Sequence, residues 1–207
     1  DQVLSRIEAA SVRCGAKQPI KLIAVTKSHP LSHIVEARRF GITQIGENKV
    51  QEAVKKFVNT KSVSGLTKRF IGHLQSNKIN KCLALFDTID SVSSLRLANK
   101  INNKARNLGI TIPVLLGVNT AGEAQKSGFS PNETEDMLAV TSLKNLSVGG
   151  LMTVGPSNQE TTETRIAFKK LRNLKEELNL EAILLINDFC KLLDNAFIIS
   201  WDLFEFE

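Results

Sequence analysis

The sequence predicts an α/β protein with a parallel β-sheet, and two features of the 207-residue chain support this fold class. Short apolar segments rich in β-branched residues alternate with longer amphipathic segments from residue 20 to residue 178. The connections are short, and no linker, low-complexity stretch or change of composition divides the chain. Strict alternation of strands and helices is typical of parallel sheets. We therefore expect one domain, residues 1–207, with either a closed barrel or an open sheet covered on both faces.

The first half of the chain contains three predicted strands. The segment "IKLIAVT" is apolar and rich in β-branched residues, which is typical of a strand. Pro30 marks the start of the helix that follows and Gly41 marks its end, which are the usual places of these residues at helix termini. The predicted strands of this half are residues 20–26, 42–46 and 69–74, and the helices after the first two are residues 31–40 and 48–59.

The second half contains three more predicted strands and three helices. The segment "ITIPVLLGVN" is apolar at nearly every position, as expected of a strand that is covered on both faces. A (β/α)8 barrel would need two further units after residue 180, and such barrels typically have about 250 residues, so any barrel here is compact. The predicted strands are residues 85–90, 110–119 and 146–153, and the helices are residues 93–108, 132–141 and 160–178.

The composition is that of an ordinary soluble globular protein, with 42% hydrophobic and 23% charged residues. The three cysteines form no CxxC pair or cysteine–histidine cluster, so we expect no disulfide framework and no metal site, and we favour a reducing cytoplasm. The net charge of +6 is spread along the chain without a nucleic-acid-binding motif. The polar start "DQVLSRIEAA" predicts no secretory signal, and no apolar run approaches the roughly 20 residues of a transmembrane helix.

Polar side chains gather where the predicted strands end. In a parallel sheet these carboxyl ends lie together, and they carry the ligand site in both barrels and open sheets. The phosphate-binding patterns GxGxxG and GxxxxGK[ST] do not follow the first strand, so neither a dinucleotide site nor a P-loop is predicted. The residues at strand ends are Lys27, Glu47, Asn48, His73, Gln75, Asp90, Ser91, Asn119, Gly122 and Met152–Pro156.

Lys27 is the most informative of these residues because it directly follows an apolar strand. A lysine that is removed from water loses its proton more readily, and its neutral amine can form a Schiff base with an aldehyde. An isolated lysine at a strand end is more often an ordinary surface residue. The residues alone therefore leave both interpretations open.

Five segments, "LIAVTKSHP", "IGENKVQEA", "FIGHLQSNK", "VNTAGEAQKSGF" and "GLMTVGP", occur in this order. In sequence and spacing they resemble the pyridoxal-phosphate homeostasis protein family, whose members are similar to the barrel domain of alanine racemase. The resemblance covers roughly residues 1–180, and residues 181–207 are divergent. It implies a single, compact (β/α)8 TIM-type barrel with a divergent C-terminal end that binds pyridoxal 5′-phosphate (PLP).

The resemblance also implies which residues form the cofactor site. It places PLP on Lys27 as an internal aldimine and places Asn48, His73 and Met152 beside the cofactor. Each of the last three also has a structural alternative: Asn48 as a helix cap, His73 as a rim histidine and Met152 as packing. The other two histidines are interpreted as surface residues and two cysteines as small core residues, namely His29, His33, Cys82 and Cys190.

The chain departs from the family pattern in two places. Lys68 and Arg69 stand where the family usually has Trp-His before "FIG". The C-terminal end lacks the "SMGMS"-type loop and the "RIG"-type turn that hold the cofactor phosphate in the family, and Ala182–Ile186 carry neither a hydroxyl group nor a glycine. The spacing of apolar residues from Ile186 to Phe197 predicts a buried helix, followed by a short final strand.

The function that we expect is the carriage or buffering of PLP without substantial turnover, so no catalytic residue is assigned. The implied partners are PLP and PLP-accepting apoenzymes, with the protein acting as a monomer that binds neither nucleic acid nor a membrane. Two alternatives stay open. One is a barrel that has lost its cofactor and serves as a scaffold, and the other is a PLP-dependent amino-acid racemase. The racemase is disfavoured because the chain has no tyrosine, the residue that such racemases use on the second face of the cofactor.

Overall fold

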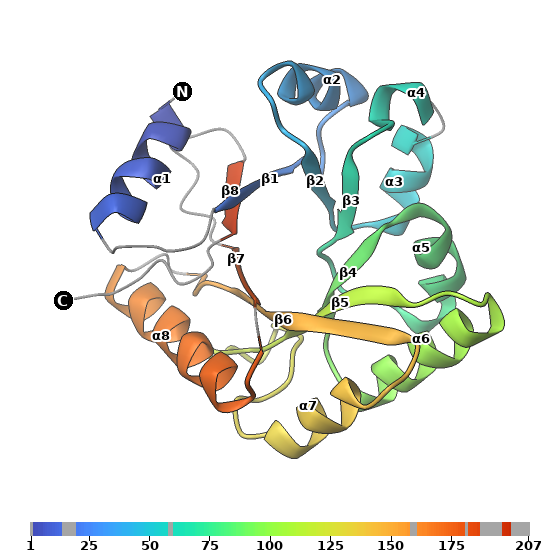
Figure 1. The fold of residues 1–207 in the computed structure, drawn as a ribbon, viewed down its shortest axis with the longest axis vertical. Helices are drawn as coiled ribbons and strands as arrows, with labels where there is room; N and C mark the ends of the chain where they lie inside the picture. The colour runs from blue at the N-terminus through green and yellow to red at the C-terminus, as the bar shows by residue number, and fades with distance from the viewer. Residues whose placement is uncertain are drawn as a thin grey trace.

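One curled β-sheet lies at the centre of the molecule, and helices surround it (Figure 1). The computed structural model describes residues 2–13, 20–57, 60–157, 161–180, 182–186 and 196–199. The sheet has eight strands in the order β7-β6-β5-β4-β3-β2-β1-β8. The strands are β1 (Lys21–Val25), β2 (Gln44–Glu47), β3 (Thr67–Phe70), β4 (Thr88–Val92), β5 (Ile112–Gly117), β6 (Leu146–Val154), β7 (Ala182–Ile186) and β8 (Ala196–Ile199).

Strands β1 to β7 pair in parallel, whereas β8 pairs antiparallel with β1. The predicted α/β fold with a parallel sheet is therefore confirmed, but the described residues do not form the eight parallel strands of a (β/α)8 barrel. The short connection between β7 and β8 explains the difference. Residues 187–195 are fewer than the dozen or more that a parallel crossover needs, whereas a short connection can reverse the chain.

Helices follow most of the strands and lie on the outer side of the sheet (Figure 1). Among the described residues, no helix is both long enough and apolar enough to cross a membrane. The helices are α1 (Gln2–Arg13), α2 (Leu31–Arg39), α3 (Val50–Phe57), α4 (Thr60–Val63), α5 (Ile79–Leu85), α6 (Leu95–Asn107), α7 (Thr134–Thr141) and α8 (Thr161–Glu177), with a short 3-10 helix at Ser76–Lys78.

The region between β3 and β4 differs most from the sequence prediction. The predicted strand 69–74 is β3, which ends at Phe70, so residues 71–74 form a loop. Helix α5 was not predicted, and the apolar run that includes its end was assigned to the fourth strand. A short apolar run fits a buried helix and a buried strand equally well, because neither period can be recognised over so few residues.

The C-terminal segment also differs from its prediction. The apolar spacing from Ile186 to Phe197 predicted a helix, but Ile186 ends strand β7 and Phe197 lies in β8. Residues 187–195 lie outside the described residues. Strand β7 forms because its backbone pairs in register with β6, with Gly150 opposite Ala182. This pairing is a tertiary contact that the local apolar pattern does not encode. Most of the predicted helix falls on residues that are not described, and the predicted short final strand corresponds to β8.

Two apolar layers stabilise the sheet. The outer layer lies between the strands and the helices, and in it the Phe86 ring meets the rings of Phe57 and Phe70 edge to face, at centroid distances of 5.8 and 5.2 Å. The inner cluster fills the concave side of the sheet and contains Ile23, Val25, Leu115, Met152, Ala182 and Leu184.

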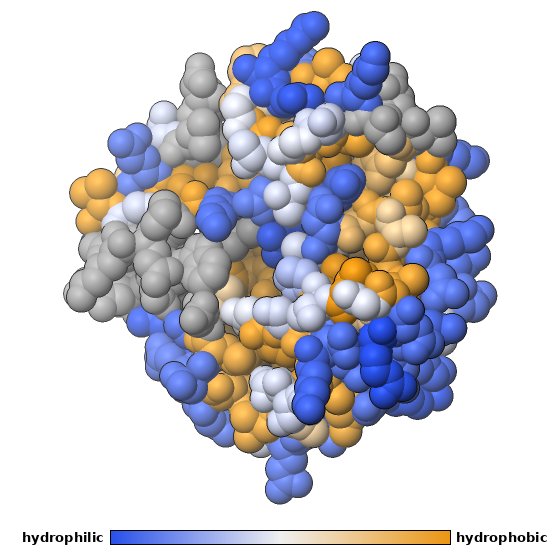
Figure 2. All heavy atoms as spheres, turned by 45° about the vertical axis from the view of Figure 1, so that its right-hand side comes forward, coloured by the Kyte–Doolittle hydropathy of each residue, from blue (hydrophilic) through white to orange (hydrophobic). Residues whose placement is uncertain are grey.

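On the face of the molecule that Figure 2 shows, apolar areas lie between hydrophilic ones.

Candidate functional site

Three of the four predicted cofactor residues follow neighbouring strands of the sheet. Lys27 comes after β1, Asn48 after β2 and His73 after β3, and these strands pair in the order β1-β2-β3. Parallel strands place their carboxyl ends on the same side. The fold therefore brings Lys27, Asn48 and His73 to one end of the sheet, as the sequence predicted.

Lys27 lies in a tight turn that leaves strand β1. The His29 amide donates a hydrogen bond across the turn to the Thr26 carbonyl oxygen at 3.1 Å. Ser28 has a φ of +63°, in the left-handed region that non-glycine residues seldom occupy. The Lys27 side chain itself is half-buried. The turn begins directly after Val25, which belongs to the apolar inner cluster.

Asn48 is half-buried, and the loop after β3 lies directly against its backbone. Gly72 makes this approach possible, because a Cβ atom at that position would overlap the Asn48 carbonyl oxygen. Within the described part of the chain, the Asn48 side chain makes no hydrogen bond to the backbone of α3. Helix capping therefore does not explain its place, and its amide can meet a ligand.

His73 and Met152 occupy contrasting environments. His73 is exposed in the loop after β3, at the same end of the sheet as Lys27. Met152 belongs to strand β6 and is only 5% exposed, because it packs in the inner cluster with Val25. The packing alternative for Met152 thus has direct structural support, and its sulfur lies on the inner side of the strand that faces the curl.

A buried ion pair lies on the inner side of β3 and β4. Phe70 packs in the outer layer, so the alternation along β3 places Arg69 on the inner side. Its guanidinium donates to both carboxylate oxygens of the fully buried Asp90, at 2.6 and 3.1 Å. It also donates to Gln44, and Thr88 donates to Asp90. Burial raises the pKa of Asp90 above its usual range, while Arg69 and Thr88 act in the opposite direction.

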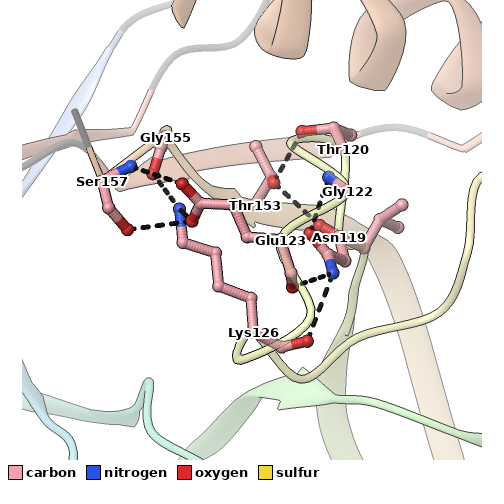
Figure 3. Close-up of polar contacts among 9 residues, drawn as sticks. Asn119, Thr120, Gly122, Glu123, Lys126, Thr153, Gly155 and Ser157 are labelled. Atoms are coloured by element: carbon pink, nitrogen blue, oxygen red, sulfur yellow. Dashed lines mark hydrogen bonds and ion pairs between the residues drawn. The ribbon is translucent and has the colours of Figure 1, made fainter. Parts of the chain in front are cut away.

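The loops after β5 and β6 are joined by a second polar network (Figure 3). The Glu123 carboxylate accepts hydrogen bonds from the Ser157 backbone N–H and hydroxyl, both at 2.9 Å. Lys126 pairs with Glu123 at 2.6 Å and donates to the Gly155 carbonyl oxygen. These bonds lower the pKa of Glu123 to about 2, with the bond from Lys126 as the largest cause. The carboxylate is therefore ionised at any physiological pH.

The cysteines and metal-binding groups offer no second reactive centre in the described ranges. Burial raises the pKa of the Cys82 thiol to about 12, so this side chain is protonated and packs as a small apolar residue, as the sequence suggested. Cys190, which was interpreted in the same way, lies outside the described residues. No group of three or more histidine, cysteine or acidic side chains within those ranges is arranged to hold a metal ion.

Several polar residues of this end were not recognised from the sequence. Lys56, on α3, donates to the Thr26 carbonyl oxygen and pairs with the buried Glu47. Its place in an amphipathic helix resembled that of any surface lysine, and no sequence signal could have found it. Lys126 lies inside a quoted motif, but its spacing of three from Glu123 was the only hint of an ion pair.

Comparison with known proteins places these features in a family. The family described as "Alanine racemase, N-terminal domain" matches residues 2–187. The pyridoxal phosphate homeostasis protein of Aquifex aeolicus is 36% identical over 182 residues, which make up 87% of this chain and 79% of that protein. The chain belongs to the pyridoxal phosphate homeostasis protein family. The resemblance found in the five sequence segments is thereby confirmed.

Solved structures agree with this assignment to the homeostasis protein family. PipY of Synechococcus elongatus, in a structure with PLP bound, is 30% identical with a TM-score of 0.72, and the match covers 86% of this chain and 87% of PipY. An alanine racemase of Clostridium difficile has a TM-score of 0.69 but only 18% identity, over 90% of this chain and 50% of the racemase. The racemase therefore supports the fold alone.

Proposed function

We propose that this protein binds PLP through Lys27 and carries or buffers the cofactor, without substantial turnover of its own. The observation that carries the proposal is the Lys27 turn, which begins directly after Val25 of the inner cluster and places a half-buried lysine at the carboxyl end of β1. A relative of similar length, PipY, is 30% identical and is described with PLP bound. The Aquifex aeolicus relative is named for PLP homeostasis rather than for racemisation.

The described residues fit the aldehyde and ring of PLP. When bound, PLP would supply an electrophilic aldehyde, and Lys27 would supply the primary amine that a covalent link to it requires. Asn48 would offer an amide that makes no hydrogen bond to α3, and Met152 with Val25 would offer apolar side chains of the inner cluster. His73 is exposed at the same end of the sheet, so its imidazole would be available to a polar group of the cofactor.

The wider proposal concerns the whole chain. In it, residues 1–207 form one domain in which β8, which lies beside β7 as well as β1, closes the curled sheet into a barrel. The protein acts as a cytoplasmic monomer, with PLP-accepting apoenzymes as the recipients of the cofactor. The lack of a CxxC or disulfide pattern supports the cytoplasmic location. The lack of any tyrosine in the sequence argues against a two-base racemase.

Borohydride reduction tests the covalent link to Lys27. Hydride adds to the C=N carbon and fixes PLP as a secondary amine, which peptide mass mapping locates. We expect the adduct on the peptide that contains Lys27, its loss in Lys27→Ala and its retention in Lys49→Ala, an exposed lysine close to the same end of the sheet. An adduct that persists in Lys27→Ala contradicts the assignment. The absence of any adduct in the unmodified protein favours the scaffold alternative, and rapid amino-acid racemisation by the same sample would contradict the carrier function.

A further inference from the structure

The backbone on both sides of Lys27 is held by charged side chains from the next βα unit. Three of these side chains form what we call the charged cluster: Glu47 at the end of β2, and Glu52 and Lys56 on α3. They contact the Lys27 turn, residues 26–29, at Thr26 and at Ser28. All of these contacts are hydrogen bonds between polar groups.

The contacts to Thr26 are short and buried. The Lys56 ammonium donates to the Thr26 carbonyl oxygen at 2.6 Å and to the Glu47 carboxylate at 2.7 Å. The Thr26 hydroxyl donates to the same carboxylate oxygen at 2.6 Å. The Glu47 side chain is fully buried and that of Lys56 is 12% exposed, so water screens these charges weakly. Hydrogen bonds with a charged partner are roughly twice as strong as neutral ones.

The contact to Ser28 holds a conformation that the chain would otherwise avoid. Ser28 has a φ of +63°, which is unfavourable for a residue with a Cβ atom. Its backbone N–H donates to the Glu52 carboxylate at 3.2 Å. Lys56 lies 3.9 Å from Glu52, one helical turn away, and thereby links the two contacts. The strained residue follows directly on Lys27, so its conformation fixes the direction of the chain at the amine.

We infer that the charged cluster is a positioning device for Lys27: it fixes the backbone before and after this residue and so holds its amine in the direction that PLP attachment requires. This inference rests on the proposed function. Stability alone does not account for the arrangement, because buried ion pairs can often be replaced by apolar residues without loss of stability. One carboxylate oxygen of Glu47 is buried without a hydrogen-bond partner, which lowers the stability of the folded state.

The test uses two variants that remove the contacts in different ways. Lys56→Met alone would leave the Glu47 carboxylate buried without its cation, so it is combined with Glu47→Gln. Glu52→Ala removes the acceptor for Ser28 at a position that is 31% exposed, where a substitution is compatible with folding. Glu52→Gln keeps an acceptor oxygen and serves as the rescue variant. Lys55→Met is the matched control, because Lys55 is the exposed neighbour of Lys56 on the same helix.

Two readouts need no cofactor. The first is amide hydrogen exchange of Ser28 and His29 by NMR. We expect it to rise by about tenfold in both test variants, as for the loss of one hydrogen bond, and to stay at the wild-type rate in Glu52→Gln and Lys55→Met. The second is trace acetylation of Lys27 relative to Lys81, an exposed lysine on α5, in the same sample, which we expect to rise in the same two variants only.

A third readout, the share of PLP on Lys27 after borohydride reduction, links the charged cluster to cofactor attachment. We expect it to fall in the test variants and to be retained in Glu52→Gln and Lys55→Met. If wild-type protein takes up no PLP, the proposed function fails while the first two readouts still judge the cluster. If amide exchange and Lys27 acetylation are unchanged in a folded test variant, the positioning role is wrong. Should the double variant not fold, Glu52→Ala decides the matter alone.

Discussion

At the scale of single residues, Arg69 and Asp90 show how a departure from the family pattern is accommodated. Arg69 stands where the family usually has histidine, and it donates to Asp90 inside the curl of the sheet. Asp90 is fully buried and accepts from Thr88 as well, so each of its oxygens has a partner. The guanidinium thus offsets the free-energy cost of burying a carboxylate. Removing either partner alone leaves the other charge buried without a counter-charge, which destabilises the fold.

We expect Arg69→Met to lower the free energy of unfolding at pH 7 by about 3–5 kcal/mol, because it leaves a buried carboxylate without its cation. Its loss also removes the main influence that opposes burial, so the pKa of Asp90 rises further. An acid whose pKa is higher in the folded than in the unfolded state destabilises the folded protein as the pH rises above the unfolded-state pKa, which is near 4 for aspartate. Urea unfolding should therefore show a smaller deficit at pH 4 than at pH 7. An equal loss of unfolding free energy at pH 4 and pH 7 would contradict this account. The double variant Arg69→Met with Asp90→Asn should be more stable than Arg69→Met alone, because it no longer buries an unpaired carboxylate.

Glu123 provides a second pH-dependent prediction, with the opposite sign. Its pKa is lowered from 4.5 to about 2, so it contributes stability that is present above pH 4.5 and is lost as the pH falls towards 2. We expect Glu123→Gln to lower the urea midpoint at pH 7 and to match the unmodified protein near pH 2. Glu36→Gln, an exposed site on α2, is the control and should change neither midpoint. A deficit of Glu123→Gln that is the same at both pH values would show that the loop contacts do not depend on its charge.

At the scale of elements, two adjacent glycines in β6 have different roles. Gly150 lies so close to β7 that a Cβ atom would overlap the Ala182 carbonyl oxygen. A Cβ atom at Gly149 would have Leu115 at 3.9 Å, which is an ordinary contact. Gly150 therefore sets the spacing of β6 and β7, whereas Gly149 has room for a methyl group.

Gly150→Ala should consequently lower the free energy of unfolding by about 1–3 kcal/mol, as overpacking does in other cores. Gly149→Ala should leave it unchanged or slightly higher, because alanine restricts the unfolded chain. Chemical denaturation of the two variants side by side measures the difference. Equal stability of both would mean that β7 shifts without cost and that the close approach has no structural role.

The sequence predicted elements well where one period or one strong signal dominated. Residues 110–119 were assigned to a strand from a nearly unbroken apolar run, and β5 occupies Ile112–Gly117. The long helix predicted at 160–178 is α8. Helix α5 was missed, because its apolar residues continue into the next strand without a turn signal. Strand β7 was missed for a different reason, since it forms through pairing with β6, which no local pattern encodes. A short final strand was predicted, and β8 lies at that end of the described residues, although its antiparallel pairing with β1 was not foreseen.

The candidate site divides in the same way. The shared position of Lys27 and Asn48 was predicted because residues at the ends of parallel strands lie together whatever the details of the fold, whereas their assignment to the cofactor came from the family resemblance. Their supporting residues were not found. Lys56 lies in the middle of an amphipathic helix, and Arg69 and Asp90 were noted separately, because only the pairing of β3 with β4 brings them within 2.6 Å. First contacts with a ligand follow from topology, whereas supporting contacts depend on register and rotamers.

At the scale of the whole molecule, the proposed site takes its groups for the aldehyde and ring of PLP from the ends of β1, β2 and β3, so the phosphate would need groups from other strand ends. Parallel-sheet barrels normally bind a phosphate through backbone N–H groups of the last βα loops, where glycines allow close approach. In this chain the last parallel strand, β7, has the sequence "AILLI", and no arginine follows Arg172. The proposed site therefore offers fewer groups to the phosphate than to the aldehyde and ring.

We expect this inequality to appear as poor discrimination between PLP and pyridoxal, which lacks the phosphate. The loss of two or three charge-assisted hydrogen bonds, at roughly 1.5–3 kcal/mol each, weakens phosphate binding more than a hundredfold relative to a family member with the complete loop. Equilibrium titration of the protein with each aldehyde, followed by absorbance, measures the ratio of the two dissociation constants, with Lys27→Ala as the blank for covalent attachment. Dissociation constants within about tenfold of each other fit the prediction, since tenfold corresponds to 1.4 kcal/mol. Tight binding of PLP together with far weaker binding of pyridoxal would show that the divergent C-terminal segment provides a phosphate site of its own.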